Sequence, residues 1–267
     1  MTPHGAPAAL APRGSEPVFS PDEVERYARH LVLSGVGGPG QQALKAASVA
    51  VVGAGGLGAP VIQYLAAAGV GRLILIDDDD VALSNLQRQT IFSMADLGRP
   101  KVEAAKDFVA RLNPAVAVEP HRARFCEGTA ALLSGADVVA DGTDNAAARY
   151  AIADGCEMAK IPLVSAAVHG FSGQITTLIP FETGPNGQPN PTYRCLYPAP
   201  PPDALTDVCA REGILGAVTG ILGTLQAGEV LKLILKIGDP LVGRLLLVDA
   251  LGAGFETIRY ARAPHIS

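Results

Sequence analysis

Short apolar runs alternate with helix-like segments through the first two thirds of the chain. The runs at 48–53 and 72–77 carry no polar face, which is typical of strands buried on both sides of a sheet. Further strands are predicted at 116–119, 136–141 and 162–168. The segments between them show helical spacing or end at helix stop signals, and they predict helices at 58–68, 101–112, 129–133 and 146–160. This alternation predicts a parallel sheet of βαβ units with helices on both faces.

The pattern changes after the fifth predicted strand. The apolar run at 171–180 follows that strand with only a turn between them, so the two are expected to be antiparallel. A proline-rich crossing at 180–208 comes next, then a long apolar helix at 214–237 and a final hairpin at 243–261. The sequence therefore predicts an α/β fold in which antiparallel strands are added to the sheet in the C-terminal part.

The first 20 residues are rich in Ala, Pro and Gly and offer little apolar surface to bury, so a disordered tail is expected there. Order is expected to begin with a helix at 20–33, where Ser20 and Glu23 are spaced as a reciprocal capping box. Residues 21–267 are predicted to form one domain, including a crossover loop at about 180–210.

Composition indicates a compact protein, with 48% apolar and 18% charged residues. The net charge of −5 gives no general attraction for nucleic acid or for an anionic membrane. Four polar residues interrupt the long helix at intervals of three or four: Gln226, Glu229, Lys232 and Lys236. That helix is therefore expected to be a core or subunit-interface helix and not a membrane span. Four cysteines are too few for a disulfide scaffold and the start lacks an apolar signal stretch, so a cytoplasmic location is expected.

Residues 53–58 read G-A-G-G-L-G between a predicted strand and a predicted helix. Asp77 lies at the end of the next strand, which completes the fingerprint of a Rossmann-like dinucleotide-binding fold. Glycines let the backbone approach phosphate, and the candidates are Gly53, Gly55, Gly56 and Gly58. Asp77 can accept hydrogen bonds from ribose hydroxyls. NAD, FAD and ATP share the group that such a loop recognises, so the loop leaves the ligand open.

Polar side chains gather in the loop after the second strand, at the edge where ligands of open α/β sheets bind. The candidates there are Ser84, Asn85, Arg88 and Gln89. Lys101 begins the next helix, an unfavourable place for a cation beside the positive end of the helix dipole. A nucleotidyl-transferring enzyme needs cations around a triphosphate. Arg88 and Lys101 are therefore predicted to contact phosphates, the alternatives being a surface ion pair and a solvated lysine.

Acidic residues follow two strands. Asp77 begins a run of four aspartates, and Asp78–Asp80 are expected to be mostly solvated, with a metal cluster as the alternative. Asp141, Asp144 and Asn145 follow the strand that ends near residue 141. Asp144 and Asn145 either cap the next helix or bind the nucleotide. Beside a triphosphate, an aspartate such as Asp144 suits Mg²⁺, which takes few protein carboxylates.

Seven motifs, in chain order, resemble the ubiquitin-activating E1-like adenylyltransferases of the MoeB/ThiF/HesA type: RYARHLVL, VVGAGGLGAPVIQYLAAAGVG, SNLQRQ, GRPKVEAA, DGTDN, YRCLYPAPPP and CAREGILG. The resemblance runs from about Asp22 to Tyr260. It implies a homodimer that uses ATP and Mg²⁺ to join the C-terminal Gly-Gly carboxylate of a ubiquitin-fold sulfur carrier to AMP, with release of pyrophosphate. Sulfur transfer would follow, with a separate protein as the possible sulfur donor.

The resemblance also implies roles for individual residues. Gly56 and its neighbouring glycines would hold phosphate, Asp77 the ribose, and Asp144 the Mg²⁺ that accompanies ATP. The residues that line the phosphates would be Asn85, Arg88 and Lys101. Arg29, the second arginine of RYAR, would reach into the partner subunit's site.

Many such relatives carry zinc between two Cys-x-x-Cys pairs, and tetrahedral zinc needs four ligands. Here Thr192 stands where the first cysteine of one pair belongs, beside Cys195, and the C-terminal tail has no cysteine, so no structural zinc is predicted. A Cys195–Cys209 disulfide is not expected in a reducing compartment. Cys126, Cys156 and Cys195 are interpreted as small apolar side chains. Cys209 occupies the position of the family's sulfur-transferring thiol, and both a catalytic or carrier-linking role and an inert loop cysteine stay open.

Two further hypotheses compete with adenylation. A Rossmann-type NAD-binding oxidoreductase explains the glycine loop and Asp77. It leaves four predicted site residues without a role: Arg29, Arg88, Lys101 and Asp144. A non-catalytic protein that only binds a ubiquitin-like partner explains the resemblance without chemistry.

Overall fold

The computed structural model describes residues 19–185, 187–200 and 213–263. Within them the strands are β1 (Ser48–Val52), β2 (Arg72–Ile76), β3 (Ala117–His121), β4 (Val138–Asp141), β5 (Leu163–His169), β6 (Ser172–Leu178), β7 (Arg244–Asp249) and β8 (Gly254–Arg259). The α-helices are α1 (Pro21–Arg26), α2 (Ala28–Leu31), α3 (Gly37–Ala46), α4 (Gly58–Ala68), α5 (Lys101–Leu112), α6 (Ala146–Ala159) and α8 (Gly216–Leu235). The 3₁₀ turns are η1 (Leu83–Asn85), η2 (Met94–Asp96), η3 (Glu127–Leu133) and η4 (Tyr193–Cys195).

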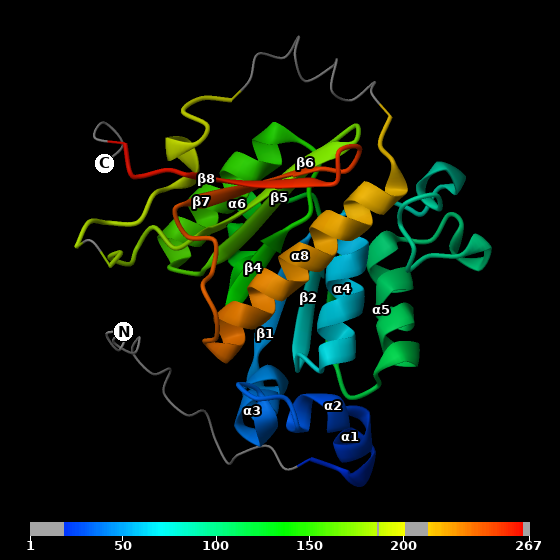
Figure 1. The fold of residues 1–267 in the computed structure, drawn as a ribbon. Coiled ribbons are helices and arrows are strands. Elements are labelled where there is room, and N and C mark those ends of the chain that lie inside the picture. Colours follow the sequence, from blue (N-terminus) through cyan, green and yellow to red (C-terminus); the bar gives the residue numbers. More distant parts are fainter. Residues whose placement is uncertain (1–18, 186, 201–212, 264–267) are drawn as a thin grey trace.

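The strands form one sheet in the order β3-β2-β1-β4-β5-β6-β7-β8 (Figure 1). Neighbours from β3 to β5 pair in parallel, and β6, β7 and β8 add to them in antiparallel fashion. Helices α4, α5 and α8 cover one face of the sheet, and α6 covers the other. The predicted fold class is therefore confirmed. The strand order reverses at β1 and β4, which is where α/β sheets of this kind bind ligands.

Local signals placed most elements correctly. The capping box at the start of α1 is present, since Glu23 N donates to Ser20 Oγ at 3.2 Å and Ser20 N donates to Glu23 Oε2 at 2.8 Å. Gly69 closes α4 with a φ of 83°. The predicted helix at 20–33 is instead two short helices, α1 and α2, with the buried Tyr27 between them. The prediction of a disordered tail falls, up to residue 18, outside the described residues.

Helix α8 is long and apolar enough, by length and composition, to cross a membrane. In the fold it packs as a core helix against α4, β5 and β6, as the sequence predicted. A Cβ added at Gly223 would lie 2.3 Å from Pro60 Cγ of α4, so the two helices can approach this closely only with glycine there.

The polar stripe of α8 points partly into the protein. Gln226 is fully buried, and its Nε2 donates to Asp141 O and to Val164 O, both at 2.8 Å. Glu229 is 5% exposed, and its Oε2 accepts from Thr177 Oγ1 and from Leu241 N, both at 2.8 Å. These bonds attach α8 to strands β4, β5 and β6 and to the segment just before β7.

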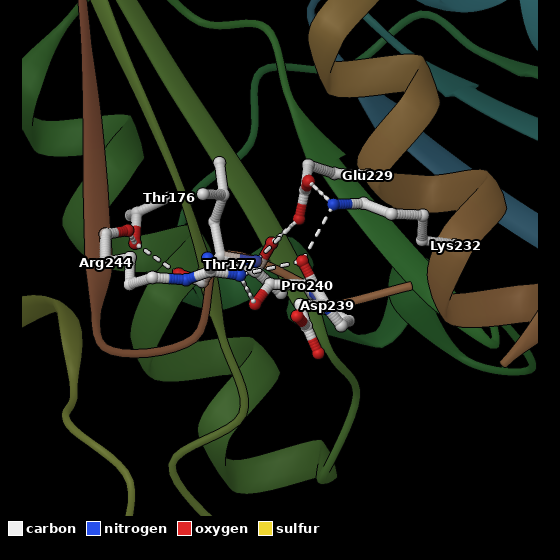
Figure 2. Close-up of polar contacts among 8 residues, drawn as sticks. Thr176, Thr177, Glu229, Lys232, Asp239, Pro240 and Arg244 are labelled. Carbon is white, nitrogen blue, oxygen red and sulfur yellow. Dashed lines mark hydrogen bonds and ion pairs between the residues drawn. The ribbon is translucent and has the colours of Figure 1, made fainter. Parts of the chain in front are cut away.

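Figure 2 shows the cluster around Glu229 at the start of β7. Lys232 pairs with Glu229 and also donates to Asp239 O at 2.9 Å. Arg244 Nη2 donates to Asp239 O at 2.8 Å and to Pro240 O at 2.9 Å. The connection between α8 and β7 is thus held by side chains from both elements, which anchors the antiparallel part of the sheet to the helix.

We expect Glu229→Gln to destabilise the protein, because an amide replaces a buried carboxylate that accepts two hydrogen bonds and faces a lysine. The free energy of unfolding should fall by about 1.5–3 kcal/mol, the range for hydrogen bonds to a charged group. Urea unfolding measures this change. Glu256→Gln, on the exposed strand β8, is the matched control and should leave the midpoint in place. Equal midpoints for both variants would show that Glu229 does not anchor the antiparallel strands.

Candidate active site

The glycine-rich loop at 53–58 joins the end of β1 to the start of α4. Gly53 has a φ of 90°, and a Cβ added at Gly58 would lie 1.9 Å from Gly53 O. No side chain fits at Gly58, so the first turn of α4 closes tightly on the strand. Ala59 N of this first turn already donates to Gly55 O at 2.9 Å, and Pro60 has no N–H. The N–H groups that suit phosphate oxygens are therefore those of Gly55, Gly56 and Leu57, just before the helix.

Asp77 follows β2 and braces this loop. Its Oδ2 accepts from Ala54 N at 2.7 Å, and its Oδ1 accepts from Asp79 N at 2.9 Å. Burial raises the pKa of the Asp77 carboxyl, and the nearby Lys101 offsets part of that rise. The carboxylate therefore sits beside the glycine loop, where the sequence predicted a ribose contact, and also holds the loop in shape.

Lys101 is 4% exposed although it begins α5. Its Nζ lies 2.7 Å from Asp79 Oδ2, and Asp79 O accepts from Lys101 N at 3.0 Å. Asp80 pairs with Arg122 at 2.9 Å. Asp78, Asp79 and Asp80 are all exposed, as the sequence predicted, although the fold brings a cation to Asp79 and to Asp80. Asp77, Asp78 and Asp79 do place ligand oxygens within 4.8 Å of one another, but Lys101 already neutralises part of this cluster.

The segment after η1 lies across the glycine loop. Arg88 Nη1 donates to Ser84 O at 3.1 Å, and Arg88 Cδ is 3.4 Å from the place of a Cβ on Gly56. Asn85 Oδ1 accepts from Ala82 N at 3.0 Å and closes the turn. Gln89 is 2% exposed, and its buried Oε1 has no hydrogen-bond partner among the described residues. Arg88 and Gln89 thus flank the loop, as the sequence predicted.

The segment 141–145 forms the opposite wall of this loop. A Cβ on Gly53 would lie 2.9 Å from Gly142 C, so the two loops are in contact. Asp141 is fully buried and accepts from Thr143 Oγ1 at 2.7 Å and from Ser165 Oγ at 3.0 Å, and burial raises the pKa of its carboxyl. Asp141 therefore has a structural role.

Asp144 and Asn145 differ in their surroundings. Asn145 Oδ1 accepts from Ala148 N at 2.8 Å, so Asn145 is the N-cap of α6, one of the two alternatives for it. Asp144 is exposed, and its carboxylate accepts no hydrogen bond from the part of the chain that the structure describes. An exposed, ionisable carboxylate next to the glycine loop fits the donor chemistry of Mg²⁺.

Sequence reasoning missed two residues at this site. Thr219 of α8 packs on the glycine loop, with Cγ2 3.0 Å from the place of a Cβ on Gly56. Arg149 of α6 reaches under the 141–145 segment, where its Nη2 donates to Thr143 O at 2.9 Å. Arg149 is a cation in the first turn of a helix, so the argument used for Lys101 could have found it. Only tertiary packing places Thr219.

Arg29 lies at the other end of the sheet. It is exposed on α2, and the neighbouring Tyr27 accepts from Asn113 Nδ2 at 2.8 Å, just past the end of α5. The ends of α4 and α5 lie at the amino ends of the strands, whereas the glycine loop lies at their carboxyl ends (Figure 1). Within one subunit, the structure does not bring Arg29 together with the other predicted site residues.

The cysteines form no common site in the described ranges, where Cys126, Cys156 and Cys195 are free. Cys195 Sγ lies 3.4 Å from Thr192 Oγ1 and accepts from Ala263 N at 3.4 Å. Burial raises the pKa of Cys156. Cys209 lies outside the described residues, so both alternatives for it stay open. The absence of structural zinc stays a prediction.

Comparison with known proteins places this geometry in a family. The ThiF family model matches residues 27–266. The chain is 48% identical over 244 residues to the SAMP-activating enzyme E1 of Haloferax volcanii, over 91% of this chain and 87% of that protein. It is 42% identical over 247 residues to the sulfur carrier protein adenylyltransferase of Thermus thermophilus, over 92% and 90% of the two chains.

The fold agrees with these matches. A structure of E. coli MccB with ATP superposes with a TM-score of 0.78 and 25% identity, over 91% of this chain and 73% of that chain. The predicted resemblance is therefore confirmed, and the chain belongs to the ThiF family.

Proposed function

We propose that this chain uses ATP to adenylate the C-terminal carboxylate of a ubiquitin-fold sulfur carrier. The observation that carries the proposal is the buried Lys101, a cation at a helix start beside Asp77 and the glycine loop. A site for hydride transfer needs no such charge, whereas a triphosphate does. Relatives named as a sulfur carrier protein adenylyltransferase and a SAMP-activating enzyme support the choice of substrate.

The residues fit ATP in a consistent orientation. The N–H groups of the glycine loop suit phosphate oxygens, and Asp77 suits the ribose hydroxyls. Arg88 and Lys101 neutralise the phosphates from the two sides of the loop. Asp144 would hold Mg²⁺, which supplies further neutralisation of the charge that develops on the leaving group.

The reaction is a substitution at the α-phosphorus. An oxygen of the carrier's terminal carboxylate attacks, and a new O–P bond forms. The bond from phosphorus to the α–β bridging oxygen breaks, and its electron pair leaves with pyrophosphate. The attacking carboxylate is already ionised at neutral pH, so no general base is needed. The chain's own contribution is to align the two anions and to screen their repulsion.

A homodimer would complete this site. Arg29 is exposed and lies at the amino ends of the strands, opposite the glycine loop of its own subunit. It can therefore approach only the glycine loop of a second copy. An arginine delivered in this way adds a positive charge where the triphosphate reacts. Activity would then require dimerisation.

Pyrophosphate should be released only when ATP and a carrier from the same genome are both present. Asp144→Ala should lower that rate about 100-fold or more, because a group that stabilises developing charge is lost. A coupled phosphate assay measures the rate, and Asp22→Ala, on the exposed surface of α1, is the control. Binding of NAD in place of ATP would favour the oxidoreductase, and carrier binding without pyrophosphate would favour the non-catalytic binder.

Lys101→Ala should weaken ATP binding about tenfold to 100-fold, since one charge-assisted contact to phosphate is lost. Titration calorimetry with ATP measures this affinity. Lys106→Ala, exposed on the same helix, should bind ATP as the wild type does. Equal loss in both variants would indicate a general electrostatic effect instead of a phosphate contact.

Subunit mixing tests the role of Arg29. At an ATP concentration near the wild-type Kd, Arg29→Ala and Lys101→Ala should each release little pyrophosphate alone. When the two are unfolded and refolded together, about one quarter of wild-type pyrophosphate release should return, because half of the dimers are mixed and each has one intact site. No recovery, with mixed dimers shown by native mass spectrometry, would place Arg29 in its own subunit's site or outside catalysis.

A further inference from the structure

Arg149 is a half-buried cation near the start of α6 that the proposed reaction does not use. A positive charge is unfavourable there, beside the positive end of the helix dipole. Its Nη2 donates to Thr143 O at 2.9 Å, while its buried Nε has no hydrogen-bond partner among the described residues. The nearby Asp141 balances the charge of the guanidinium. An arginine kept at this cost needs an explanation.

The space beside Arg149 is too small for a substrate. It lies between the guanidinium, β5, β6 and the segment around η4, and its volume is about 10 Å³. A space of this size has room for one water molecule. Neither a nucleotide nor a peptide can reach Arg149 through it, so the role of Arg149 follows from the protein atoms that it binds.

The acceptor of Arg149 is the carbonyl oxygen of the peptide group that joins Thr143 to Asp144. A peptide group is planar, so a hydrogen bond to its oxygen also fixes the direction of its N–H, which belongs to Asp144. Arg149 thus sets the direction of the backbone where it enters the residue proposed to bind Mg²⁺.

Further restraints hold the backbone on both sides of Asp144. Before it, Thr143 N and Thr143 Oγ1 donate to Asp141 Oδ1 at 3.0 and 2.7 Å. After it, Asn145 Oδ1 accepts from Ala148 N at 2.8 Å and caps α6. The Asp144 carboxylate itself accepts no hydrogen bond from the described residues. A restrained backbone that carries an uncommitted carboxylate suits a metal ligand, which must be held in place before the metal binds.

We propose that Arg149 is a positioning residue for Asp144: its hydrogen bond to Thr143 O holds the Asp144 carboxylate where it can bind the Mg²⁺ that accompanies ATP. The inference rests on the proposed function, because it explains how that site presents its metal ligand. Arg149 itself contacts neither the metal nor the nucleotide. Without its hydrogen bond, the peptide group between Thr143 and Asp144 can rotate and turn the carboxylate away from the metal.

Titration calorimetry with ATP, in excess Mg²⁺ and in EDTA, tests this role without the carrier. The ratio of the two affinities is the gain that Mg²⁺ gives. Arg149→Met removes the donor but keeps much of the side chain's length, and it should lower this gain about fivefold or more. Loss of the positive charge alone would raise the gain, because free ATP carries more negative charge than its Mg²⁺ complex. Arg149→Lys, which keeps a charged donor, should recover part of the gain.

A double-mutant cycle separates positioning from a general structural role. Arg149→Met should lower the gain in the wild type but not in Asp144→Ala, where the metal ligand is already lost. Arg111→Met, at an exposed arginine of α5, is the matched control and should keep the wild-type gain. Thermal melts identify any variant that fails to fold. If Arg149→Met does not fold, Arg149→Gln, whose side chain is too short to replace the bond, carries the same expectation.

Three results would overturn the inference: a normal Mg²⁺ gain in the folded Arg149 variants without the donor, an equal effect of Arg149→Met with and without Asp144, or no gain in the wild type. Pyrophosphate release separates the inference from the proposed function. If the wild type adenylates a carrier but Arg149→Met keeps the gain, the positioning role is wrong and adenylation stands. If the gain falls as expected but no carrier supports pyrophosphate release, adenylation is wrong and Arg149 still positions Asp144.

Discussion

The close approach of the glycine loop to the 141–145 segment is the constraint on which the rest of the site depends. A Cβ on Gly142 would lie 2.9 Å from Gly53 O and 3.0 Å from Gly58 N. Backbone therefore packs directly on backbone where β1 and β4 end. This contact places the phosphate-binding loop, the exposed Asp144 and the carbonyl that holds Arg149 within one small region, although they come from segments far apart in the chain.

Helix α8 keeps this arrangement rigid through buried polar groups. Gln226 donates to the carbonyl of Asp141 at the end of β4, and Glu229 binds Thr177 of β6 and the backbone of Leu241. An apolar helix could pack on the same sheet, but it would lack these hydrogen bonds to the strands. The polar stripe thus couples the loop that carries Asp144 to the antiparallel strand β6 and to the segment that leads into β7.

The charges of the site follow one scheme, in which each buried cation has a nearby acid. Lys101 is paired with Asp79, and Arg149 lies near Asp141. Such pairs let a cation remain in a low-dielectric region without a ligand. A bound anion can then compete for the cation, since the partner carboxylate of Lys101 is largely exposed and can be hydrated.

The sequence by itself determined the local elements and the identity of the phosphate loop. Apolar runs, Gly69, Asn113-Pro114 and the box of Ser20 and Glu23 act over a few residues, so their effect can be predicted from the chain alone. Strand order, the ion pairs of Asp79 and Asp80, and the inward direction of Gln226 and Glu229 depend on partners distant in sequence. Arg149 shows the difference most clearly: its place at a helix start is visible in the sequence, but its bond to Thr143 O and its buried, unpaired Nε follow only from the packing around it. Only the tertiary structure decides such features, because they depend on which distant segments pack against one another and exclude water between them.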